Sequence, residues 1–273
     1  MRKVIAVNKD NYAVIEVAKQ GPPGAGGDSF YVRPTPMSIT VGGAVTGTSF
    51  NGSVQDCLDI ILYPYQDPTF TNFDLFGFST LEVGAAIPAG NLTFSWNTSN
   101  SENIIPDTIS IRNSSDGITY VTDSSNDGLE TVTIASNVQR VTSGAKTFTI
   151  YAKNTKDLNI SRNYNVNWYW KVWYGESTNT SLDTEEEVES LRVGQLRSSV
   201  NGTYSFLGGG YKWIAYPTLM GLKSNFTDVA TGFPVAMEVP ITVSLTNAYG
   251  ITTNYYVHRT YNVLGGSINI AVS

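Results

Sequence analysis

Short runs in which apolar and polar residues alternate dominate the chain, and this pattern predicts strands rather than helices. In the middle of the chain the runs are residues 92–96, 108–111, 118–121, 130–135, 147–153 and 164–174. Turn-forming residues lie between them, as in Ser-Ser-Asp-Gly at 114–117 and Asn-Asp-Gly at 126–128. Later runs at 202–216, 239–246, 251–259 and 267–272 continue the pattern. We therefore expect a mainly β fold.

Two segments carry a helical signature instead. The first begins at Ser53, an N-cap residue, with Asp56 three positions later as in a capping box, and it ends before Pro64. Thr184 and Glu187 form a second capping box at the start of a short acidic helix. A helix of about ten residues is marginal on its own. We therefore expect the first helix to pack its apolar stripe on neighbouring strands.

Shifts in composition divide the chain into four expected parts. Residues 1–28 hold two short β-like stretches and then a Gly-Pro-rich segment, which reads as a linker or as a stub of collagen-like triplets. Two triplets are too few for a stable triple helix, so the linker is preferred. The other parts are a small helix-containing module at 29–79, a β-sandwich at 80–175 and a C-terminal β domain at 176–273.

The apolar residues of this N-terminal arm fall in two short runs that cannot bury themselves. We expect them to need a partner surface, and they can add as strands to an exposed sheet edge. The Gly-Pro segment would then supply reach between the arm and the rest of the chain. The candidate anchor residues are Val4, Ile5, Val7, Val14, Ile15 and Val17.

The run at residues 164–174 is the most aromatic strand of the chain. The strand period places Tyr164, Val166, Trp168, Trp170, Val172 and Tyr174 on one face, which we expect to be core. The opposite face is polar at first and then carries Tyr169 and Trp173. We expect these two rings to pack on an adjacent module, to form a subunit contact or to stack on sugar rings, in that order of preference.

Composition narrows the classes of partner. The 273 residues carry a net charge of −6, and the 17 Lys and Arg are scattered, so no basic patch for nucleic acid is expected. No apolar run approaches the roughly 20 residues of a membrane helix, and the first residues do not form a secretory signal. We therefore expect no membrane insertion and no signal peptide.

Candidate chemistry is sparse. His258 is the single histidine and lies in a strand-like run, so we expect a hydrogen-bonded or exposed strand residue rather than a catalytic base. The carboxylate pairs Asp56 with Asp59 and Glu102 with Asp107 leave glycoside hydrolysis as the residual enzyme class, but their spacing is not diagnostic. We therefore expect a protein that is not an enzyme, with no catalytic residue, no cofactor and no metal site.

Five segments carry a resemblance to a known class of proteins: residues 47–70, 81–84, 92–100, 210–217 and 246–250. They resemble structural proteins of tailed bacteriophages, which look like fibre or appendage components with Ig-like and other β modules behind a short virion-anchoring N-terminus. The chain has no cysteine pair, so an Ig-like sandwich rests on strand number, strand spacing and this resemblance.

The resemblance implies a structural component of the virion, a fibre or appendage on the tail, neck or head, made in the host cytoplasm. It would act in particle assembly and host-surface attachment. The expected partners are other virion proteins, further copies of the chain, with a homotrimer as the best guess, and host surface glycan. The alternative is a carbohydrate-binding or carbohydrate-active β protein acting on host surface glycan.

Overall fold

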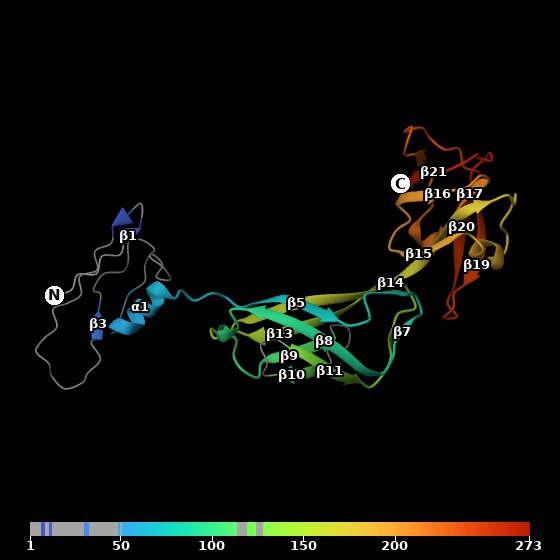
Figure 1. Ribbon diagram of the computed structural model, residues 1–273. Coiled ribbons are helices and arrows are strands. Elements are labelled where there is room, and N and C mark those ends of the chain that lie inside the picture. The colour runs from blue at the N-terminus through green and yellow to red at the C-terminus, as the bar shows by residue number, and fades with distance from the viewer. Residues whose placement is uncertain are drawn as a thin grey trace, which may run out of the picture. The chain divides into compact units, whose positions relative to one another are not determined.

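The computed structural model describes residues 7–8, 11–12, 30–32, 49, 51–113, 119–123 and 128–273. The chain divides into two compact units, residues 1–66 and residues 67–273. The fold is mainly β, as the alternating pattern predicts (Figure 1). The limits of the four parts expected from the sequence remain predictions.

The described residues of the first unit form two antiparallel strand pairs and one helix. β1 (Val7–Asn8) pairs with β2 (Asn11–Tyr12), β3 (Phe30–Val32) pairs with β4 (Asn51–Ser53), and the helix is α1 (Val54–Leu62). The predicted capping box is confirmed, because Ser53 Oγ accepts from the Asp56 amide at 3.1 Å and Asp56 Oδ2 accepts from the Ser53 amide at 3.0 Å. The helix lies near β3 and β4. However, the expectation that its apolar stripe is buried is wrong at Leu58 and Leu62, which are exposed.

Only one of the candidate anchor residues falls in the part of the chain that the structure describes. Val7 lies in β1, opposite Tyr12 of β2. The other candidates, Val4, Ile5, Val14, Ile15 and Val17, lie outside the described residues. The anchor therefore stays a prediction.

The first half of the second unit packs two sheets around one core, and we call it the first lobe. Its strands are β5 (Thr69–Leu75), β6 (Thr80–Glu82), β7 (Ala86–Ile87), β8 (Gly90–Ser99), β9 (Ile109–Asn113), β10 (Thr119–Asp123), β11 (Gly128–Ile134), β12 (Val138–Gln139), β13 (Gly144–Lys153) and β14 (Asn159–Ser177), with a 3₁₀ turn η1 (Ser101–Asn103). One sheet has the order β11-β8-β5, and the other contains β10-β9-β13-β14. Phe94 of β8 and Phe148 of β13 meet across the core with ring centroids 5.4 Å apart.

The remaining elements form the second lobe. They are α2 (Glu185–Glu189), β15 (Val193–Arg197), β16 (Gly202–Phe206), β17 (Tyr211–Pro217), η2 (Thr218–Met220), β18 (Phe226–Asp228), β19 (Ile241–Thr246), β20 (Thr252–Arg259) and β21 (Ile268–Val272). The large sheet continues through β14-β17-β20-β19, and a second sheet has the order β16-β21-β18. The Thr184 to Glu187 capping box is confirmed at the start of α2. The run predicted at 202–216 is two strands, because the glycines at 208–210 form a turn inside it.

The 19 residues of β14 belong to both lobes. Its first half pairs with β13, where Asn159 lies opposite Lys153, and its last residues pair with β17, where Ser177 lies opposite Tyr211. β6 and β15 also pair with it. The predicted core face is confirmed: Val166, Trp168, Trp170, Val172 and Tyr174 are buried, with Tyr164 half-buried. Both lobes are therefore built on one strand.

Candidate functional site

The two candidate contact rings lie where β14 passes from one lobe to the other. Tyr169 is half-buried, and its carbonyl accepts a hydrogen bond from the Val83 amide at 3.0 Å. Trp173 is also half-buried and lies opposite Gly194 of β15. The Trp173 ring covers this glycine, because a Cβ at position 194 would lie 2.5 Å from it. The ring also packs on the buried cluster formed by α2, β17, β19 and β20.

Lys171 lies between the two rings and connects three strands. Its Nζ is 3.1 Å from Glu82 Oε2 of β6 and 5.3 Å from the centroid of the Trp173 ring. Its carbonyl accepts a hydrogen bond from the Tyr255 hydroxyl of β20 at 3.1 Å. This part of the outward face is therefore occupied by contacts within the chain.

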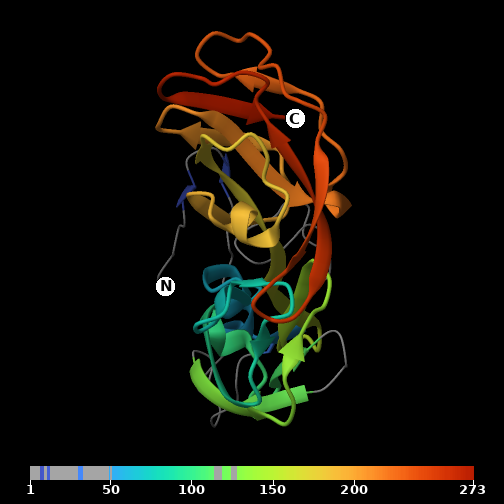
Figure 2. The same cartoon turned by 90° about the vertical axis from the view of Figure 1, so that its right-hand side faces the viewer.

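The turn between β19 and β20 reaches the first lobe (Figure 2). Asn247 Nδ2 donates to the Val83 carbonyl at 2.6 Å, and Asn247 Oδ1 accepts from the amides of Tyr249 and Ile251. Gly84, with φ of +90°, lies against this turn, since a Cβ there would come within 2.7 Å of Ile251 Cγ1. We call this contact the joint, defined by Val83, Gly84, Asn247, Tyr249 and Ile251.

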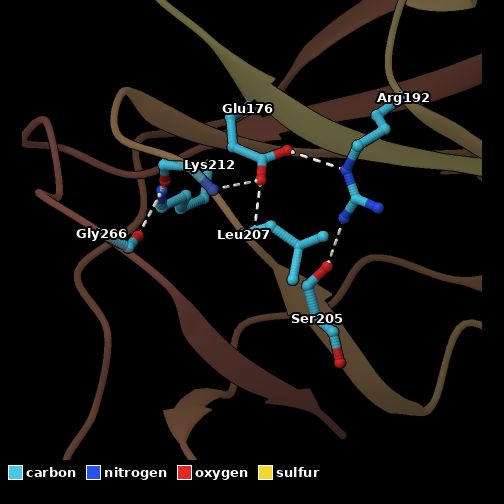
Figure 3. Close-up of polar contacts among 7 residues, drawn as sticks. Glu176, Arg192, Ser205, Leu207, Lys212 and Gly266 are labelled. Carbon is cyan, nitrogen blue, oxygen red and sulfur yellow. Dashed lines mark hydrogen bonds and ion pairs between the residues drawn. The ribbon is translucent and has the colours of Figure 1, made fainter.

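A cluster of charged groups holds the glycine turn of the second lobe (Figure 3). The Glu176 carboxylate accepts from the amides of Leu207 and Gly208 and lies 3.2 Å from Arg192 Nε. Arg192 Nη2 donates to the Ser205 carbonyl at 2.6 Å. Burial raises the pKa of Glu176, but these hydrogen bonds outweigh it and hold that pKa below its ordinary value. The carboxylate is therefore an ionised part of the framework.

Lys212 lies behind the same turn and is fully buried. Its Nζ donates to the carbonyls of Gly208 and Gly266 (Figure 3). Burial lowers the pKa of Lys212, and the nearby charge of Glu176 opposes that shift. Both charged groups thus bind the backbone of the turn, and the charge of Glu176 favours the charged form of Lys212.

His258 is a core residue, 2% exposed. Its Nε2 lies 2.9 Å from the Tyr216 hydroxyl, and its ring stacks on Tyr216 at a centroid distance of 5.5 Å. The Lys223 amide donates to the same hydroxyl at 3.0 Å, whereas His258 Nδ1 is buried and has no hydrogen-bond partner in the described part of the chain. Burial lowers the pKa of His258 to about 4. The prediction of a hydrogen-bonded strand residue is confirmed.

The carboxylate pairs have local contacts as well. Asp56 caps α1, Glu102 Oε1 accepts from Asn103 Nδ2 at 3.3 Å, and Asp107 takes a left-handed turn conformation with φ of 60°. No group of three or more His, Cys, Asp or Glu side chains placed to hold a metal ion occurs among the described residues. The described helices include none long and apolar enough to cross a membrane.

A polar surface that the sequence did not single out lies on the outward face of β9, β13 and β14. Asn163 and Asn165 are exposed there, and each amide is fixed by a threonine of β13: Thr149 Oγ1 donates to Asn163 Oδ1 at 2.8 Å, and Thr147 Oγ1 donates to Asn165 Oδ1 at 2.7 Å. We call it the amide face, consisting of Ser110, Arg112, Thr147, Thr149, Tyr151, Ser161, Asn163 and Asn165. The alternate Asn residues were visible in the sequence, but their neighbours on β9 and β13 follow only from the register.

No protein-family model, no curated protein and no solved structure matches the chain. A function for the chain is therefore inferred from its own residues and from the geometry of these surfaces.

Proposed function

We propose that the chain is a structural component of a tailed-phage virion, a fibre or appendage protein that acts in particle assembly and host-surface attachment. The resemblance of its segments to such proteins suggests this class. The structural observation that best supports it is β14, since two lobes that share a strand have no linker between them. Such continuity would suit a protein that displays modules away from a particle.

In this role the N-terminal arm would bind other virion proteins, and the second unit would be displayed. Three copies would form the working assembly, located on the virion. The work of the protein is binding and support, which requires no cofactor, no nucleic acid and no catalytic step. Charged and titratable groups such as Glu176, Lys212 and His258 have structural contacts that fit this role.

The second candidate is a carbohydrate-binding or carbohydrate-active β protein that is not carried on a particle. The amide face favours it, because exposed amides and hydroxyls are suited to sugar hydroxyls. The two candidates differ in one observable respect, which is whether the protein remains with purified virions.

The test is immunogold labelling and peptide mass spectrometry of purified particles from the phage that encodes the chain, with a gene-deletion phage as control. We expect label at one position on the tail, neck or head, and a copy number that is a multiple of three. Protein found only in the soluble lysate, with none on the particles, would contradict the proposal.

A further inference from the structure

We propose that the amide face is a binding site for a polysaccharide that carries carboxylate groups. The inference rests on the proposed attachment role and names the surface and the ligand class for it. It differs from sugar stacking at Tyr169 and Trp173, the last of the three contacts expected for those rings, and the Trp173 ring packs on Gly194 and on the buried cluster of the second lobe.

The strand register places polar side chains in rows across the sheet. Arg112 of β9 lies opposite Thr149 of β13, which lies opposite Asn163 of β14. The next row is Ser110, Tyr151 and Ser161. Ser110 and Thr149 are buried beneath their neighbours, whereas Arg112, Ser161, Asn163 and Asn165 are exposed. Adjacent strands are about 4.8 Å apart, so these exposed side chains form an array in which several groups can contact one extended chain at once. The apolar partners of these residues, such as Phe148 and Ile150, face the core.

The hydrogen bonds among these side chains determine which donor groups remain for a ligand. The side-chain oxygens of Asn163 and Asn165 accept from threonine hydroxyls, which fixes the orientation of both amides. Each Nδ2 group carries two donor hydrogens, and the Arg112 guanidinium carries five. Because these donors lie on an exposed surface, the face suits a partner rich in acceptors, such as sugar hydroxyl and carboxylate oxygens.

The charges on the amide face also favour a ligand that carries carboxylates. None of the residues that β9, β13 and β14 place on this face between positions 110 and 167 is Asp or Glu, although the chain has 23 acidic residues and a net charge of −6. Arg112 is exposed, with Cζ 5.0 Å from the centroid of the Tyr151 ring. Lys153, at the end of the face, is paired with Asp157 at 2.7 Å. A guanidinium on an aromatic ring, on three strands that place no carboxylate on this face between positions 110 and 167, is complementary to an anionic ligand.

The hydroxyl and amide groups of the face distinguish a carboxylated polysaccharide from a polyanion that has no hydroxyls. A polyanion without hydroxyls would meet Arg112 and the amide donors through its carboxylates, but it would have no hydroxyl to donate to the side-chain oxygens of the face. A neutral polysaccharide would use the amides and would not need Arg112. A carboxylated polysaccharide uses both, so both kinds of substitution are expected to weaken its binding.

The experiment measures binding of the full-length protein to three immobilised polymers: polygalacturonate, dextran and poly-L-glutamate. We expect binding to polygalacturonate only. Arg112→Gln should weaken it at least tenfold. The double variant N163D/N165D should weaken it more, because each aspartate still accepts the threonine hydroxyl but replaces two donor hydrogens with a negative charge. Unchanged circular dichroism and melting temperature show that the variants fold.

Matched controls lie in the second lobe. Lys223→Gln removes one positive charge, as Arg112→Gln does, and Asn201→Asp changes an exposed amide to a carboxylate. Both should bind as the parent protein does. Retention by poly-L-glutamate or dextran equal to that by polygalacturonate, no retention by polygalacturonate, or unchanged binding of the amide-face variants would each overturn the inference. A change in oligomeric mass in Arg112→Gln would also overturn it, by showing an interface between copies.

This result is independent of particle labelling. If virions carry the protein and polygalacturonate does not bind, the inference is wrong and the proposed function stands. If polygalacturonate binds through the amide face and virions lack the protein, the proposed function is wrong and the second candidate gains support.

Discussion

Single polar residues inside the second lobe hold specific pieces of backbone in place. His258 and Tyr216 connect β20 to the segment after η2, and Glu176 and Lys212 hold the glycine turn between β16 and β17. Each group is buried or nearly so, and each has a protonation state that the fold requires. Stability should therefore depend on pH through named residues.

His258 should make the second lobe acid-sensitive. Its pKa is about 4 in the fold and about 6.5 in an unfolded chain, so the unfolded state binds the proton first as pH falls. The stabilisation is fully present above pH 6.5, is lost as pH falls through 4, and amounts to about 3 kcal/mol. Urea unfolding at pH 7, 5.5 and 4 measures it.

The carboxylates also titrate toward pH 4, so the comparison is with His258→Gln, which keeps a hydrogen-bond acceptor near the Tyr216 hydroxyl. Between pH 6.5 and 4 the parent protein should lose more free energy of unfolding than this variant. Parallel pH profiles for the two proteins would show that the imidazole is not the responsible group.

Glu176→Gln should destabilise the second lobe by about 2 kcal/mol, because it weakens hydrogen bonds to a charged acceptor and removes the charge near buried Lys212. The measurement is the free energy of unfolding in urea at pH 7. Glu102→Gln is the control, since Glu102 is exposed and should change stability by less than about 0.5 kcal/mol. Equal effects of the two substitutions would argue against a structural role for Glu176.

At the scale of elements, contacts between residues close in sequence can be predicted, whereas the pairing of distant strands cannot. Both capping boxes join residues three positions apart, so the sequence alone indicates them. β15 was missed because Val193–Arg197 has little alternation and is a strand only by pairing with β14. The amide face was missed for the same reason: its rows depend on which strands are neighbours. The strand period places Tyr169 and Trp173 on the face opposite the core residues, but the sequence does not show which contacts they make.

The close packing at the joint should require glycine at position 84, because glycine has no side chain. Gly84→Ala introduces a Cβ 2.7 Å from Ile251 Cγ1 at a φ of +90°, and it should cost about 2–3 kcal/mol. Gly77→Ala is the matched control, because Gly77 has a φ of +82° and no atom within 4 Å of the added Cβ. It should lower the free energy of unfolding by only about 1 kcal/mol, which is the cost of a positive φ in a residue with a Cβ. Equal losses in thermal unfolding would show that the joint is not closely packed.

On the scale of the whole molecule, we expect the N-terminal arm to bind the particle and the second unit to fold without it. Deleting residues 1–28 should leave a soluble protein with a β-type circular dichroism spectrum, since the core of the second unit lies within residues 67–273. The truncated protein should be absent from purified virions. Normal incorporation would place the anchor elsewhere, with the exposed helix α1 as the next candidate.

The strand shared by the two lobes has a consequence for how the protein unfolds. Separating the lobes cannot leave both intact, because β14 supplies pairing to β13 in one and to β15 and β17 in the other. Calorimetry of residues 67–273 should therefore show one heat-absorption peak, with calorimetric and van't Hoff enthalpies equal. Two resolved peaks would mean that the lobes melt separately. If there is one peak, a force applied to the second lobe is transmitted along the β14 backbone to the first lobe, and the two lobes resist it as one cooperative unit.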